Sequence, residues 1–374
     1  MGSDHEHWLR KSGFFRAVVG YREAVDLLKD PRMHSYLLSD FDALGVTSRT
    51  LREVAQASLL NLNGEEHKRS RSLVAGCFTP RAAEQHRAVA RDAAHELITT
   101  LEANGSCDFV KDFATPYIRK STSHFVGFSR EEVAAGREGV EFISSAMKKP
   151  INRVDAREQA VVLALVESAR STLEERRRQP RGDVLTLVAN EVASSSLPEF
   201  VGLGIVMALL SAGFEPTINQ LGITVTELSR RPQIWDALGT GELKPTSVVE
   251  AVLRFRSTNQ GVMRRVAASF EYRGARFEAG EQIVIGLAAA SHDRRRFPEP
   301  DRLVLDEENP SHLSFGLGPH HCLGAALARV QLQEAIGALT QRLTCPEILE
   351  VVEWQGAGLV GPTSLAVSLS SRFS

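Results

Sequence analysis

The chain has few of the residues that mark special protein classes. Its 374 residues include only four cysteines, and aromatic residues make up 6%. Cys77, Cys107, Cys322 and Cys345 form no CxxC pair and no usual zinc-ligand spacing. The sequence therefore does not predict a disulfide framework, and it favours a reduced, cytoplasmic setting.

The chain also lacks a surplus of either charge and lacks a long apolar run. Lys and Arg number 44 against 46 Asp and Glu, for a net charge of −2. This balance gives no electrostatic footprint for nucleic acid. No stretch of 18 uninterrupted apolar residues is present, and the first residues, MGSDHEHWLRK, are polar. We therefore expect no membrane span, no signal peptide and no nucleic-acid partner.

Most of the sequence patterns that are present are typical of helices. Apolar periodicity, N-cap residues and C-terminal glycine predict helices at 81–104 (ending before Gly105), 155–178, 198–229 (with Ser196, Pro198 and Glu199 at its start), 245–257 and 326–343. Strand signals are few: 270–277 and 282–288 flank a turn and predict a hairpin, and 365–371 alternates like a strand. We expect a single domain over residues 1–374, mainly α with a small β portion.

The predicted helix 198–229 contains a stretch that does not suit a helix interior. Residues 211–220 read SAGFEPTINQ, with Ala212, Gly213, Glu215 and Pro216 inside the most apolar segment. A proline within a helix removes one hydrogen bond and costs about 3 kcal/mol. The sequence therefore predicts a bend in this helix.

The second unusual stretch is HLSFGLGPHHCLGAALAR at 312–329. Gly316 and Gly318 allow a tight loop, and Cys322 lies at the predicted start of the next helix, where backbone N–H groups lower a thiol pKa. Gly324 removes a side chain where a bulky partner needs to lie close. By these residues alone, Cys322 could be a buried structural thiol, a nucleophile with His320 or His321, a zinc ligand or a ligand to iron in a flat macrocycle.

A resemblance narrows these alternatives. FGLGPHHCLG has each defining residue of the cysteine-loop signature of the cytochrome P450 family, F-G-x-G-x-[HR]-x-C-x-G. The resemblance implies that fold, with a long central helix over heme b (iron protoporphyrin IX). It also implies that Cys322 is the thiolate ligand of the iron, that His320 holds a heme propionate, and that Phe315 packs beside the sulfur, with Gly316 and Gly324 giving the heme room.

Other segments resemble the same family. NGEEHKRSRSLVAGCFTPR at 63–81 is similar to its heme-contacting helix, which implies propionate contacts from His67 and Arg71, one helical turn apart. An arginine ahead of the late β segment also contacts a propionate in the family. Arg265 is the first choice for it, with Arg264 next.

Two motifs depart from the family pattern. In VVEAVLRF the E-x-x-R arginine aligns with Arg254, but Ala251 occupies the glutamate position, and Glu250 lies one residue earlier. In AGFEPT, Ala212 and Gly213 keep the clearance beside the heme, but Pro216 replaces the oxygen-side threonine. Thr217 is next to it and rotated around the axis. Glu215 then becomes the leading candidate for proton relay, with a structural salt bridge as its alternative.

The resemblance implies an enzyme that activates dioxygen with electrons from a ferredoxin-type partner and its reductase. It would oxidise a small organic molecule in secondary metabolism, by hydroxylation or by carbon–carbon or carbon–nitrogen coupling. A peroxide-driven peroxygenase and an inactive ligand-binding member stay open as alternatives. Thr258, Asn259 and Gln260 either favour a polar substrate or bond loop backbone, and residues 40–60 are expected in the lid.

Overall fold

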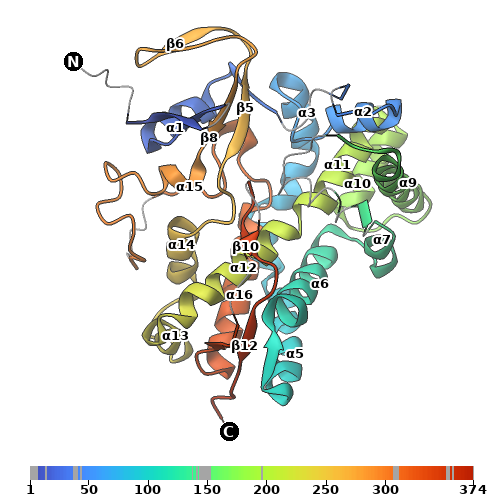
Figure 1. Ribbon diagram of the computed structural model, residues 1–374. Helices are drawn as coiled ribbons and strands as arrows, with labels where there is room; N and C mark the ends of the chain where they lie inside the picture. Colours follow the sequence, from blue (N-terminus) through green and yellow to red (C-terminus); the bar gives the residue numbers. More distant parts are fainter. Residues whose placement is uncertain are drawn as a thin grey trace.

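The structure is a computed structural model that describes residues 7–12, 15–36, 41–42, 44–136, 138–139, 142, 153–194, 197–305, 311–350, 354–355 and 358–373. Helices fill the centre, the right and the bottom of the view in Figure 1, while strands β5, β6 and β8 stand at the upper left. The expectation of a mainly α fold with a small β portion is confirmed.

The helices follow the predicted ranges closely. The α-helices are α1 Tyr21–Lys29, α2 Arg49–Gln56, α3 Gly64–Ala75, α4 Pro80–Gln85, α5 Arg87–Asn104, α6 Thr115–Val126, α7 Arg130–Ala135, α9 Ala156–Arg178, α10 Val184–Ala193, α11 Glu199–Ala212, α12 Glu215–Ser229, α13 Pro232–Gly239, α14 Pro245–Phe255, α15 Leu287–Ala290 and α16 Ala325–Arg342. Shorter turns of 3-10 or π type are η2 Gly76–Phe78, η3 Val110–Ala114 and η4 Gly318–His320.

The predicted helix 81–104 is divided at His86, and Gly105 caps its end with φ of +69°. The predicted helix 198–229 is divided too, because α11 ends at Ala212 and α12 begins at Glu215. The predicted bend is therefore present. Pro198 N-caps α11, and Ser196, the predicted cap, lies outside the described residues.

The strands form small sheets. They are β1 Leu9–Ser12, β2 Phe15–Val18, β3 Met33–Ser35, β4 Ser106–Asp108, β5 Val262–Val266, β6 Phe270–Tyr272, β7 Ala275–Phe277, β8 Gln282–Ile285, β9 Glu347–Ile348, β10 Trp354–Gln355, β11 Gly361–Pro362 and β12 Ala366–Ser368. Within the described ranges, the largest sheet has the order β1-β2-β8-β5-β3. The predicted strand at 365–371 is confirmed as β12, which pairs with β4 and β9.

The predicted pairing of 270–277 with 282–288 is wrong. Residues 270–277 form a hairpin by themselves, as β6 and β7, because Arg273 and Gly274 both take a positive φ and reverse the chain there. β8 instead pairs with β5 and, in parallel, with β2.

Two hydrophobic cores support the fold. The larger joins the helices, where α16 packs along α5 and contacts α12, α13 and α14. The smaller lies under the largest sheet and α1. Glu199–Ser229, which spans α11 and α12, is long and apolar enough to cross a membrane, but 67% of its apolar window is buried inside the protein, as in a core helix.

Candidate functional site

The loop before α16 folds tightly around Cys322. The Cys322 amide donates to the Phe315 carbonyl at 2.9 Å, and Gly316 and Gly318 have φ of +68° and +75°. A Cβ at Gly318 would lie 2.4 Å from the carbonyl oxygen of Leu28 in α1. A larger residue there would displace α1, so the glycines fix the path of the loop as the sequence predicted.

The Cys322 thiol is accessible even though protein surrounds it. Its side chain is exposed, and open space lies where Gly324 would carry a Cβ. The Gly324 amide and Arg71 lower the pKa of the thiol, but burial has the larger effect and raises that pKa above its usual value. The predicted lowering by backbone N–H groups is therefore present, but the opposite effect of the surrounding protein is larger, so the net pKa of the free thiol is raised.

A cluster of imidazoles and guanidiniums lies beside this loop. The ring centroids of His67 and His320 are 4.0 Å apart, and Arg71 donates to the His321 carbonyl at 2.6 Å. Burial, His67 and Arg264 lower the pKa of His320 to about 3. Burial also lowers the pKa of the Arg264 guanidinium, to about 10. α3, β5 and the cysteine loop thus bring their basic groups to one place, including the predicted pair His67 and Arg71.

The strand register decides which arginine joins this cluster. Arg264 is only 4% exposed, while Arg265, the next residue of β5, is exposed on the opposite side. Successive side chains of a strand point to opposite faces. The first choice of Arg265 is therefore corrected to Arg264.

The donor set fits a flat anionic group that carries a metal. His67 is 2% exposed, and its Nε2 atom has no hydrogen-bond partner among the described residues. A buried imidazole without a partner, inside a cluster of cations, is suited to an anion that the protein itself does not supply. The zinc alternative gains no support, because no group of three His, Cys, Asp or Glu in the described part of the chain could hold a metal.

The helix break lies between α11 and α12. Pro216 has no N–H for the Ala212 carbonyl, and the amide of Thr217 donates to the Phe214 carbonyl at 3.1 Å, outside the regular helical pattern. Ala212 is exposed, whereas Thr217 is buried. Glu215 is half-buried as the first residue of α12, where a carboxylate suits the helix N-terminus.

Gly213 lies where α11 ends and has no room for a side chain. A Cβ at this position would lie 2.4 Å from the Leu209 carbonyl oxygen and 3.4 Å from the Thr122 methyl group of α6. The missing side chain therefore leaves room for the last carbonyl groups of α11 itself, whereas the Thr122 contact would be an ordinary one. Ala212 is exposed and Gly213 is half-buried, so both residues of the predicted pair have accessible surface.

Comparisons with known proteins show the family of the chain. A family model described as Cytochrome P450 matches residues 246–348, which include the cysteine loop. The chain is 34% identical to the mycinamicin IV hydroxylase/epoxidase of Micromonospora griseorubida over 85% of this chain and 81% of that protein. The chain belongs to the cytochrome P450 family. Luteothin monooxygenase of Streptomyces thioluteus is 29% identical over 96% of this P450 and 89% of its own length.

Solved structures place the fold in the same family. The structure of P450BioI in complex with hexadec-9Z-enoic acid ligated acyl carrier protein superposes with a TM-score of 0.87 at 25% identity, covering 97% of this chain and 96% of that chain. This P450 is thus an oxidoreductase of the monooxygenase class, with relatives in secondary metabolism. Membership of the family implies heme as the cofactor, and the residues around Cys322 fit it.

The altered E-x-x-R motif does not regain its pair through Glu250. Arg254 is 4% exposed, and its guanidinium donates instead to backbone carbonyls, to Pro300 at 3.2 Å and to Arg302 at 2.6 Å. Glu250 forms its hydrogen bonds with Arg329 and His312, away from Arg254. Among the described residues, the buried arginine of this P450 is therefore satisfied by carbonyl groups and not by a carboxylate.

A buried polar network that the sequence did not reveal ends at the helix break. Gln331 of α16 donates to Ser121 at 3.0 Å and to Thr122 at 2.9 Å, and the Thr122 hydroxyl donates to the Gly213 carbonyl at 3.4 Å. Ser121 also lies 3.0 Å from His86 Nε2, and burial lowers the pKa of His86 to about 4. This neutral network links α16, which follows the cysteine loop, to the break in the central helix.

The residues expected to border the substrate bond the loop backbone. The amide of Thr258 donates to Gln220 Oε1 at 2.8 Å and its hydroxyl to the Val360 carbonyl at 2.8 Å. Gln260 Nε2 donates to the Ser257 carbonyl, and Asn259 Oδ1 accepts from the Gly261 amide. These contacts support the second interpretation of the three residues and remove the argument for a polar substrate.

Residues 40–60, which are expected in the lid, include α2. This helix packs on α9 and α11, and Asp40 lies outside the described residues.

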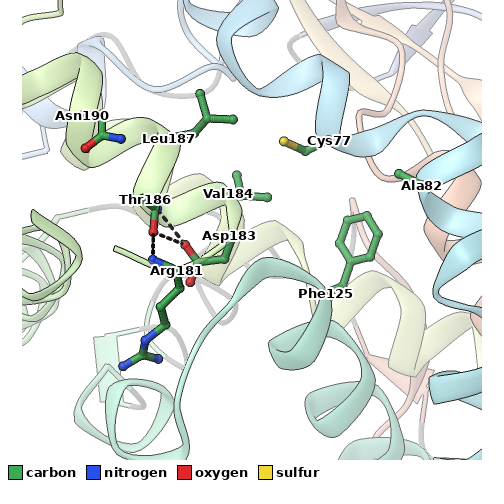
Figure 2. A pocket seen from close by; sticks show the side chains of 10 residues that line it. Cys77, Ala82, Phe125, Arg181, Asp183, Val184, Thr186, Leu187 and Asn190 are labelled. Carbon is green, nitrogen blue, oxygen red and sulfur yellow. Dashed lines mark hydrogen bonds between the residues drawn. The ribbon is translucent and has the colours of Figure 1, made fainter. Parts of the chain in front are cut away.

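A hollow of about 420 Å³ lies apart from the cysteine loop (Figure 2). Leu187 and Val184 of α10 face Phe125 of α6 across it, and Cys77 lies at its upper edge in this view. None of the predicted site residues lines this hollow. The Cys77 thiol there has a pKa raised by burial, which makes it a poor nucleophile.

Proposed function

We propose that the chain is a heme-thiolate enzyme that activates dioxygen with external electrons and oxidises a small organic molecule of secondary metabolism. The observation that carries this proposal is the buried His67 Nε2 atom without a partner, inside a basic cluster beside an accessible thiol. Heme b has two carboxylates and an iron that takes a thiolate, so it matches both halves of this arrangement.

In this proposal, the described chain forms one heme-binding domain. His67, Arg71, Arg264 and His320 hold the two propionates, and Cys322 supplies its sulfur to the iron. Bound heme with a thiolate ligand favours cleavage of the O–O bond. The chain's own contribution is to fix the position of the sulfur through the hydrogen bond from the Cys322 amide to the Phe315 carbonyl.

The reaction consumes one dioxygen, two electrons and two protons for each substrate C–H bond. One oxygen atom enters the substrate as a hydroxyl, and the other leaves as water. We assign proton delivery to the Glu215 carboxylate, one residue before Pro216. Thr217 is buried, whereas Ala212 is exposed, so we do not assign the role of the missing hydroxyl to Thr217. Coupling of two carbon atoms, or of carbon and nitrogen, is the alternative outcome when the substrate radical is captured differently.

The electrons are proposed to come from a ferredoxin-type protein and its reductase in the cytoplasm. The sequence has no iron–sulfur cysteine pattern and no flavin segment of its own. The same chemistry driven by peroxide, with no electron donor, is the second candidate, and Pro216 favours it because a proline cannot donate a proton.

The first experiment is the absorption spectrum of the purified, reduced protein with carbon monoxide. A red-shifted Soret band supports heme-thiolate ligation, and its absence contradicts the proposal and leaves an inactive binding protein. Product formation is then compared with reductase, ferredoxin and NAD(P)H against hydrogen peroxide alone. Turnover only with the electron donors supports the first candidate, and turnover with peroxide alone supports the second.

A further inference from the structure

Glu250 of α14 is the meeting point of two segments on either side of the cysteine loop. Its Oε1 atom accepts from Arg329 Nε at 2.6 Å, and its Oε2 atom accepts from Arg329 Nη2 at 3.0 Å. The same Oε2 atom lies 3.2 Å from His312 Nε2. Arg329 belongs to α16, after the loop, and His312 lies just before it. One carboxylate thus joins both ends of the loop to α14.

These contacts continue to the backbone of Cys322. The Arg329 guanidinium lies over the Phe315 ring, 4.4 Å from its centroid. The Phe315 carbonyl then accepts the Cys322 amide at 2.9 Å. On the other side, His312 Nδ1 accepts the Ser314 amide at 3.2 Å. The contacts of Arg329 and those of His312 therefore both lead to the turn that carries the Cys322 thiol.

The carboxylate is ionised and closely held. Hydrogen bonds from His312 and Arg329 keep the pKa of Glu250 at about 2, although burial alone would raise it. Two parallel N–H donors from one guanidinium give a fixed geometry as well as a charge-assisted bond. Without Glu250, the Arg329 charge would lose its counterion next to Phe315.

We infer that Glu250 is a positioning residue for Cys322: by holding Arg329 and His312 it fixes the Phe315 end of the cysteine loop. This role is separate from that of Arg254, which is bonded to carbonyl groups of the 291–302 segment. The inference rests on the proposed function, since it concerns how the thiolate is held toward heme. It also explains how the loop is fixed in a chain whose E-x-x-R motif has lost its glutamate.

The test compares Glu250→Gln with the wild-type protein, both loaded with heme. Glu242→Gln is the matched control, because Glu242 is an exposed carboxylate just before α14. We expect the reduced, CO-bound form of Glu250→Gln to lose the red-shifted band about tenfold faster than wild type, since one charge-assisted contact is lost. The control is expected to match wild type. Equal stability of the band in Glu250→Gln and wild type would overturn the inference.

A double-mutant cycle identifies the partner. If Glu250 acts through Arg329, Glu250→Gln accelerates loss of the band much less in an Arg329→Met background than in the wild-type protein, with only the contact to His312 left to lose. Its effect should instead add to that of Arg254→Lys. Additivity with Arg329→Met, together with coupling to Arg254→Lys, would overturn the inference. A wild-type protein without the red-shifted band contradicts the proposed function itself, so the two failures are distinguishable.

Discussion

On the cysteine side of the site, Glu250 holds Arg329 through two N–H donors at 2.6 and 3.0 Å. On the side of the helix break, the Gly213 carbonyl accepts a hydrogen bond from the neutral Thr122 hydroxyl at 3.4 Å. The first contact is short and charge-assisted, and the second lies near the outer limit of hydrogen-bond length. The chain therefore fixes the thiol loop strongly and holds the helix break weakly.

The difference follows from what each side has to do. The thiol loop has to keep one sulfur in one position, which favours short contacts between fixed elements. The helix break borders the accessible Ala212, and Pro216 has already removed one regular backbone hydrogen bond there. A weakly held break can change shape when a substrate enters, at a small cost in free energy.

Replacing the sulfur removes one side of this comparison altogether. Cys322→Ser is expected to abolish the red-shifted band and all turnover, because a serine hydroxyl does not replace the thiolate ligand. Cys345→Ser is the control, since that thiol lies 3.8 Å from carbonyls at the end of α12 and belongs to no predicted site. CO spectra and product assays of both variants make the measurement. Retained turnover in Cys322→Ser would contradict the assignment of the ligand.

The pH dependence of stability tests how strongly the Glu250 carboxylate is held on the cysteine side. The folded-state pKa of Glu250 is about 2, below the ordinary value of 4.5, so its carboxylate stabilises the fold above about pH 4.5. That stabilisation is lost as the pH falls toward 2. Glu250→Gln is expected to lower the free energy of unfolding by up to about 3 kcal/mol at neutral pH. Urea unfolding at a series of pH values should show the two curves converging below pH 4.5, and a constant difference down to pH 3 would contradict this.

Restoring a hydroxyl tests the oxygen side. Pro216→Thr is expected to raise product formed per NAD(P)H by up to about tenfold, because a proton donor is regained. Turnover with peroxide alone should fall. Pro216→Ala is the control, since it removes the ring without adding a hydroxyl. Product and released hydrogen peroxide are measured together, and equal gains in both variants would show that the ring, and not the missing hydroxyl, limits the reaction.

The smallest effect is expected at Thr122. Thr122→Val keeps the shape and removes both the donor to Gly213 and one of the two acceptors of Gln331, which keeps Ser121. Stability should therefore fall by about 1 kcal/mol. Backbone amides at 217 and 218 should exchange hydrogen up to about fivefold faster. Thr122→Ser keeps the hydroxyl and should match wild type. Unchanged exchange in Thr122→Val would show that the hydroxyl does not hold the break.

The sequence predicted the helices and the bend well, because both depend on local pattern. The ranges 155–178 and 245–257 are recovered as α9 and α14 within a few residues. Pro216 ends a regular hydrogen-bond pattern by its own covalent structure, whatever surrounds it. The glycine loop before Cys322 was predictable for the same reason.

Strand pairing and strand faces were harder to predict. The choice between Arg264 and Arg265 depends on a register of one residue, which exchanges the two faces of β5. One of the two partners of β8 is β2, more than 260 residues earlier in the sequence. Neighbouring residues in the sequence indicate neither which arginine faces the cluster nor which strand pairs with β8.

The contacts of Glu250 and Thr122 could not be predicted, because they depend on tertiary packing. Glu250 is four residues from Arg254, a spacing that suggests a pair within one helix. The arginine instead turns to the 291–302 segment, and the carboxylate turns to α16. Gln331 was placed on a predicted helix, but nothing in its neighbours indicated which helices it joins.

Gly318 gives the cysteine loop a place in the order of folding. It lies against the Leu28 backbone of α1, and Leu313 belongs to the sheet-side core, while Phe315 and Leu323 pack on the helical core. The loop therefore contacts both cores, and its contact between Gly318 and Leu28 joins residues 290 positions apart in sequence. Such long-range contacts form late in folding. A ribosome must release most of the chain before the contacts of this loop with both cores can form, so the loop takes its final shape only late in synthesis.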